Sequence, residues 1–202
     1  NFVGLGSWFV FFAIIEDMGE RALAISNLVR IVYLILSIPT WGFSSATNTI
    51  VGNLMGQANY ASILPSMRKT AITCFVMTMS AALPIIIWPE TFLYPLLGSS
   101  DMTLITDSKS TLYVLLIIVA FSSVISIYVN GIAGVGATLT GLLIQTLSAI
   151  SYLIAIYVVV DIWQSTLNYA WSTEIIYWIA QLVGVLWFFH KISFAKMRYA
   201  DG

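Results

Sequence analysis

The stretch that decides the fold runs from Ser110 to Val160 and reads STLYVLLIIVAFSSVISIYVNGIAGVGATLTGLLIQTLSAISYLIAIYVVV. It lies between Lys109 and Asp161, and none of its residues is charged. Because a helix needs about 20 largely apolar residues to cross a membrane, this stretch is long enough for two such helices. The Gly-rich segment Asn130-Gly-Ile-Ala-Gly-Val-Gly-Ala-Thr138 is the turn that we expect between them.

The rest of the chain has the same apolar character. Of its 202 residues, 59% are apolar and 8% are charged, and the mean hydropathy is +0.94. A soluble domain carries about a quarter charged residues, so the composition predicts an integral membrane protein. The net charge of -1, without a block of like charges, indicates no nucleic-acid partner. One cysteine, Cys74, and one histidine, His190, give no metal-binding pattern, so we expect no metal and no cofactor.

Charged residues interrupt the remaining sequence at intervals that predict four more spans. A charged cluster around Gly19 marks the turn after the first span, and Pro39 is expected to kink the second rather than divide it. Glu174 is the only charge in the last span. The sequence therefore predicts an all-α, six-helix membrane bundle over residues 1–202. The expected spans are residues 1–18, 22–55, 70–89, 111–130, 138–160 and 169–189.

Basic residues gather on one side of this arrangement. That side holds Arg68, Lys69, Lys191, Lys196 and Arg198. The other side holds two basic residues and seven acidic ones: Arg21, Lys109, Glu16, Asp17, Glu20, Glu90, Asp101, Asp107 and Asp161. Since the side rich in Lys and Arg usually faces the cytoplasm, both ends of the chain are expected there. The chain starts inside an apolar segment without Met, so we interpret it as a piece of a longer polypeptide.

Four motifs resemble those of the multidrug and toxic compound extrusion (MATE) family. They are Gly19-Glu-Arg-Ala-Leu-Ala-Ile-Ser-Asn27, Ser37-Ile-Pro-Thr-Trp-Gly-Phe-Ser-Ser-Ala46, Val51-Gly-Asn-Leu-Met-Gly-Gln-Ala-Asn59 and the Gly-rich turn Asn130–Thr138. The first three resemble the family's seventh and eighth helices, and the last resembles the turn between its tenth and eleventh helices. The resemblance covers nearly the whole chain.

The resemblance implies that the chain is the C-terminal lobe of a transporter built from two six-helix lobes. Such proteins sit in the cell (inner) membrane. They export amphipathic or cationic small molecules, such as drugs and toxic compounds, against sodium ions or protons by alternating access. The expected partners are an organic substrate, a coupling cation, the lipid bilayer and an N-terminal six-helix lobe. The residues themselves show no paired catalytic groups, so we expect a transporter rather than an enzyme.

Two charged residues inside the spans are the first candidates for a functional site. Glu174 lies about five residues into the last span, a depth of roughly 7 to 8 Å at 1.5 Å per residue. A carboxylate at that depth is costly and is usually functional, although an ion pair that only tethers helices is the alternative. Arg30 lies at a comparable depth in the second span. The hypothesis is that the two residues face each other as a coupling switch, with a permanent buried salt bridge equally open.

Two further residues complete the candidate site. Glu16 follows an apolar run at the end of the first span, and Asn130 lies at the Gly-rich turn. The resemblance also implies three carboxylates for a coupling ion, one each in the family's seventh, tenth and twelfth helices. Glu174 matches the last of these, whereas the other two positions fall near Gly4 and near Ser122 and Ser123, which are not acidic. Glu16 with Arg30 is the expected local substitute, and the choice between sodium and proton remains open.

Two other functions compete with drug export. One is a flippase of the same superfamily that moves lipid-linked oligosaccharides or polysaccharides, for which more basic residues in the spans would be expected to bind phosphate. The other is a membrane scaffold subunit that transports nothing. In a scaffold, Glu174 and Arg30 would serve stability alone.

Overall fold

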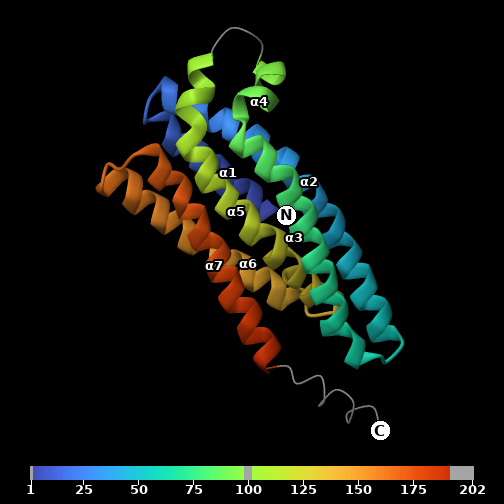
Figure 1. The fold of residues 1–202 in the computed structure, drawn as a ribbon. Helices are drawn as coiled ribbons and strands as arrows, with labels where there is room; N and C mark the ends of the chain where they lie inside the picture. The colour runs from blue at the N-terminus through green and yellow to red at the C-terminus, as the bar shows by residue number, and fades with distance from the viewer. Residues whose placement is uncertain (1, 98–101, 192–202) are drawn as a thin grey trace.

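The computed structural model describes residues 2–97 and 102–191, and within these ranges the chain is helical and contains no strand (Figure 1). This confirms the all-α membrane fold. The helices are α1 (Phe2–Glu16), α2 (Glu20–Gly56), η1 (Tyr60–Ser62), α3 (Ile63–Ile87), α4 (Pro89–Leu97), α5 (Met102–Gly134), α6 (Thr138–Tyr157), η2 (Val158–Ile162) and α7 (Leu167–Lys191).

Five segments of the described chain are long and apolar enough to cross a membrane. They are Glu20–Gly56, Tyr60–Ile87, Thr103–Gly134, Thr138–Ile162 and Leu167–Lys191. Helices suit the hydrocarbon core of a membrane, because each helix satisfies its backbone hydrogen bonds internally and needs no water to do so. The first expected span, residues 1–18, corresponds to α1, which has 15 residues. At 1.5 Å per residue, α1 extends only about 22 Å, less than the roughly 30 Å of a bilayer core.

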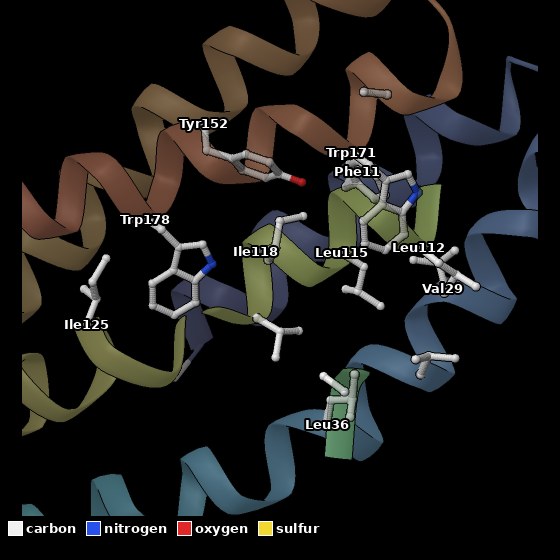
Figure 2. Packing of buried hydrophobic residues seen from close by; sticks show 14 of the residues in the cluster. Phe11, Val29, Leu36, Leu112, Leu115, Ile118, Ile125, Tyr152, Trp171 and Trp178 are labelled. Carbon is white, nitrogen blue, oxygen red and sulfur yellow. The ribbon is translucent and has the colours of Figure 1, made fainter. Parts of the chain in front are cut away.

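Helix α5 lies at the centre of the bundle. It packs against α2 and α3 on one side and against α7 on the other, while α6 packs against α7 and α1 (Figure 1). Its buried side chains Leu112, Leu115 and Ile118 are fully enclosed, and Figure 2 shows them among residues of α1, α2 and α7. A helix buried on several sides is apolar around its circumference, and this explains the long charge-free stretch on which the prediction rested.

The turns between helices follow local sequence signals. Gly19 joins α1 to α2 with φ 105°, and Gly136 joins α5 to α6 with φ 86°. Side chains rarely tolerate these positive angles, so glycine suits both turns. Helix α2 continues through Pro39 as a single helix of 37 residues, as expected for the run 22–55.

The segment after α3 differs from the expectation. The third expected span ended at residue 89, and no helix was assigned between it and the fourth span, which began at residue 111. The structure instead contains α4 there, with Pro89 as its first residue. Proline is well tolerated in the first turn of a helix, where its missing N–H would have no partner in any case. The side chain of Glu90 forms an ion pair with Lys109 of α5, which ties α4 to the bundle.

Two of the charged residues expected on the acidic side, Arg21 and Asp107, meet at one end of the bundle. Arg21, at the start of α2, forms a salt bridge with Asp107 of α5, with 2.7 Å between Nη2 and Oδ2. The same Nη2 donates a hydrogen bond to Thr103 at 2.8 Å. These contacts join the α1–α2 turn to the beginning of α5.

Candidate functional site

A cavity of about 610 Å³ opens between five helices of the bundle. Helix α2 contributes the largest share of its wall, and α1, α5, α6 and α7 contribute the rest. The lining residues are Ser7, Trp8, Tyr33, Leu34, Trp41, Ser44, Ser45, Asn48, Ser126, Asn130, Tyr152, Glu174, Tyr177 and Trp178. Small-molecule sites in proteins have volumes of about 300–1,000 Å³ and mostly apolar walls with a few polar groups, and this cavity has the same character.

Helical periodicity brings these side chains to one place. On α7, Glu174, Tyr177 and Trp178 are three and four residues apart and therefore share a face. On α2, Tyr33 and Asn48 lie on one face of the helix, and polar and aromatic residues between them lie on the same face. The cavity forms where these two stripes face each other across the bundle.

Glu174 is the one charged side chain among the lining residues that the structure describes. It is 6% exposed, and its Oε1 accepts a hydrogen bond from Nε1 of Trp8 on α1, 3.3 Å away. The indole of Trp8 also stacks near Tyr33, with ring centroids 5.2 Å apart. A carboxylate buried in this way would be stabilised by a cation or a proton.

The expected pairing of Arg30 with Glu174 is wrong. The guanidinium of Arg30 lies over the ring of Phe12, with Cζ 4.7 Å from the ring centroid, and forms no salt bridge with Glu174. Phe12 and Trp8 are one turn apart on α1, so the same helix contacts Arg30 through one aromatic side chain and Glu174 through the other. The depth of a residue in a span does not fix the direction in which it points, and aromatic residues of α1 occupy this region.

The other two candidates have different positions. Asn130 lines the cavity, although it lies within α5 rather than in the turn, and its side-chain amide donates to the carbonyl oxygen of Ser126 at 2.9 Å. Glu16 is exposed at the last residue of α1 and does not line the cavity. Neither Glu16 nor Arg30 is therefore brought together with Glu174.

Of the two further positions to which the family resemblance assigns a carboxylate, the one near Ser122 and Ser123 supplies no polar group to Glu174. Ser122 and Ser123 are buried, and their hydroxyls donate to carbonyl oxygens of α5 itself, Val119 at 3.0 Å and Ala120 at 2.9 Å. The side chains around Gly4 lie outside the described residues. In the part of the chain that the structure describes, no three His, Cys, Asp or Glu residues cluster as a metal site would require.

The sequence analysis did not single out the aromatic wall of the cavity. Trp8, Trp41 and the tyrosines at 33, 152 and 177 were not among the candidates, although all of them line the cavity. An aromatic residue in an apolar span resembles core packing when it is considered alone. The spacing of these aromatic residues could have revealed the wall, because Tyr177 and Trp178 follow Glu174 at helical intervals.

The fold and the cavity define a class of protein, a multi-pass helical membrane protein with an internal polar site. The family model MatE matches residues 2–159, which is most of the chain. The chain belongs to this family. Helix α7, with Glu174, lies beyond the matched residues. No curated protein matches the sequence.

Two solved structures share the fold over almost the whole chain. The crystal structure of MATE in complex with MaL6 has a TM-score of 0.80 at 17% identity, over 98% of this chain and 43% of that one. The second is a MOP superfamily transporter from Pyrococcus furiosus, in which reverse polarity of the binding pocket suggests a different function. Its TM-score is 0.77 at 12% identity, over 94% of this chain and 42% of that one. The chain thus spans less than half the length of either structure.

Proposed function

We propose that the chain is the C-terminal six-helix lobe of a secondary antiporter that exports amphipathic or cationic drugs and toxic compounds. The exported compound is exchanged for sodium ions or protons, and access alternates as this lobe moves against an N-terminal one. In this proposal the protein lies in the cell (inner) membrane with both ends of the chain in the cytoplasm, because the basic residues gather at that end.

The observation that carries the proposal is the position of Glu174. A buried carboxylate in a cavity of about 610 Å³ can bind either a coupling cation or the cationic group of a substrate. If access alternates only when the carboxylate is occupied, competition between these two for Glu174 couples export of one to entry of the other. Asn130 is the second polar group that we assign to the site, since it lines the same cavity.

The composition of the cavity wall favours cationic substrates over lipid-linked phosphates. No Lys or Arg is found among the described lining residues, and Glu174 would repel a phosphate group. Recognition of phosphate in proteins usually depends on arginine or lysine. This favours drug export over the flippase alternative.

Exchange measurements on the full-length protein test the proposal. Glu174→Gln keeps the size of the side chain but removes the charge, so we expect it to abolish exchange of an organic cation for sodium or protons in proteoliposomes. The matched control is Glu90→Gln, which makes the same change outside the cavity and should leave exchange unchanged. Exchange by Glu174→Gln at the wild-type rate would contradict the role proposed for Glu174, whereas a wild-type protein that exchanges nothing would favour the scaffold alternative.

A further inference from the structure

Three polar atoms of the cavity wall have no hydrogen-bond partner among the residues that the structure describes. They are Oγ of Ser44, the hydroxyl oxygen of Tyr152 and Nε1 of Trp178. The three residues are 6%, 2% and 8% exposed, and each lines the cavity. In Figure 2, Trp178 extends from its helix toward α5, and the hydroxyl of Tyr152 lies at the end of a ring that extends from α6.

Two other indoles of the bundle, those of Trp8 and Trp171, have hydrogen-bond partners. Nε1 of Trp8 donates to Glu174, and Nε1 of Trp171 donates to Oγ of Ser26 at 3.1 Å. Buried polar groups in proteins are hydrogen-bonded in the great majority of cases. Unpaired groups that line a cavity are therefore suited to a partner that enters the cavity.

The chemistry of these atoms defines the partner. The indole N–H of Trp178 can only donate, and the hydroxyls of Ser44 and Tyr152 can donate or accept. Hydrogen-bond acceptors complement all three, and uncharged oxygen atoms are the acceptors that Glu174 would not repel. The carboxylate and the faces of the aromatic rings favour a positive charge in the same space.

We propose that this cavity selects organic cations that carry hydroxyl or carbonyl oxygens. The ammonium group binds beside Glu174, and the oxygens accept hydrogen bonds from Trp178 and Tyr152. This inference rests on the proposed function, because it assigns a substrate class to the same site. A cation with only hydrocarbon substituents leaves these donors buried and unpaired, so it lacks the favourable contacts that the oxygenated cation makes.

Two matched probes test this selection. Tris(2-hydroxyethyl)methylammonium and methyltripropylammonium both carry a fixed positive charge, and they differ in that each hydroxyl of the first is a methyl group in the second. Binding of each probe to the purified protein in lipid nanodiscs is measured by calorimetry. Trp178→Phe keeps an aromatic ring but removes the N–H donor. We expect it to weaken binding of the hydroxylated cation by about 3- to 10-fold, the effect of losing one hydrogen bond, and to spare the other cation.

Trp171→Phe is the matched control, because it removes an indole N–H that is paired with Ser26 and does not line the cavity. It should affect neither probe. No effect of Trp178→Phe on either probe would overturn the inference and indicate that water pairs these atoms. Equal effects on both probes would also overturn it, because the indole N–H would then not distinguish the two cations. A wild-type protein that fails to bind the hydroxylated cation would overturn it as well.

Glu174→Gln separates this inference from the proposed function. If the cavity is a cation site, this substitution weakens binding of both probes. Weakening of both by Glu174→Gln, without selective loss in Trp178→Phe, overturns the inference and leaves the proposed function intact. If Glu174→Gln weakens binding of neither probe, the proposed function itself is contradicted.

Discussion

The indole N–H of Trp8 on α1 donates a hydrogen bond to Oε1 of Glu174 on α7, with 3.3 Å between nitrogen and oxygen. This contact joins α1, which has 15 residues, to α7, the helix that carries the buried carboxylate. It also places the indole ring beside Tyr33 of α2. A cation bound at Glu174 would therefore lie close to the indole of Trp8 on α1.

We expect Trp8 and Glu174 to be energetically coupled. In a double-mutant cycle of Trp8→Phe and Glu174→Leu, which removes the acceptor oxygen, the coupling energy should be about 1.5–3 kcal/mol, the usual contribution of a hydrogen bond to a charged group. The measurement is the free energy of unfolding of the four proteins in the same detergent at neutral pH. Simple additivity of the two substitutions would show that the hydrogen bond contributes nothing to stability.

Arg30 should instead be coupled to Phe12. Its guanidinium lies 4.7 Å from the ring centroid of Phe12, and a cation–π contact of this kind contributes about 0.5–2 kcal/mol depending on burial. A cycle of Arg30→Gln and Phe12→Leu, measured by unfolding, should give a coupling in that range. The cycle of Arg30→Gln with Glu174→Gln should give a smaller value, because these two side chains form no contact. The reverse order of the two couplings would restore the switch that the sequence suggested.

The contrast between Arg30 and Glu174 shows which properties of the site the sequence could predict. The distance between charges located Glu174 inside the last helix, because depth along a helix is a one-dimensional property of the sequence. The pairing of Arg30 depended on the rotation of α2 and on the intervening side chains of α1. The rotation of a helix about its own axis is determined by packing among all the helices. The pattern of apolar residues is a poor guide to this rotation when a helix faces lipid as well as protein, because both environments favour apolar side chains.

The fold was predictable to a similar extent. Long charge-free runs predict membrane helices because burying a charge in hydrocarbon is costly, and this argument required no information about packing. Helix α4 was missed because it has nine residues and contains two prolines, features that also characterise a loop. Its amphipathic character is expressed only against α3 and α5, which the sequence alone could not place beside it.

The close approach of α2 and α5 predicts a strong effect of one glycine. A Cβ atom added at Gly134 would lie 2.8 Å from the backbone oxygen of Asn48 and 2.8 Å from Cβ of Val51. Neither atom is the end of a flexible side chain, so Gly134→Ala should force the helices apart and destabilise the protein by about 1–3 kcal/mol. Thermal or denaturant unfolding measures this change.

Gly56→Ala is the matched control for that substitution. A Cβ atom added at Gly56 has nothing within 4 Å, whereas a Cβ atom added at Gly52, four residues earlier, would lie 3.7 Å from the backbone oxygen of Gly134. Only one member of this pair therefore faces α5. Gly56→Ala should be neutral or slightly stabilising, since alanine favours helix more than glycine does. A similar loss of stability in both variants would contradict the assignment of the close contact to Gly134.

The ion pair between Glu90 and Lys109 predicts an acid-sensitive contact at the end of the bundle. The hydrogen bond from Lys109 holds the pKa of Glu90 below its ordinary value. A carboxyl whose pKa is lower in the folded state stabilises that state above the unfolded pKa of about 4.3, and this contribution disappears as the pH falls through the folded pKa. Unfolding temperatures measured from pH 6 to pH 3 should therefore fall less steeply for Glu90→Gln than for the wild type. Lys109→Met should give the same flattening, and an unchanged slope in both variants would remove this role.

The last prediction concerns the chain as half of a transporter. Each of its membrane helices satisfies its own backbone hydrogen bonds, and α5 packs against most of the others, so the bundle is expected to fold in a membrane by itself. Alternating access requires two units that move against each other around a shared site, and the chain spans 43% and 42% of the length of the two similar structures. We therefore expect the 202 residues alone, in liposomes with an imposed sodium or proton gradient, to show no exchange of an organic cation. Co-expression with the N-terminal lobe of the same transporter should restore exchange, and Glu174→Gln in this chain should abolish the restored activity. Exchange by the chain alone, for example as a homodimer, would refute the half-transporter proposal.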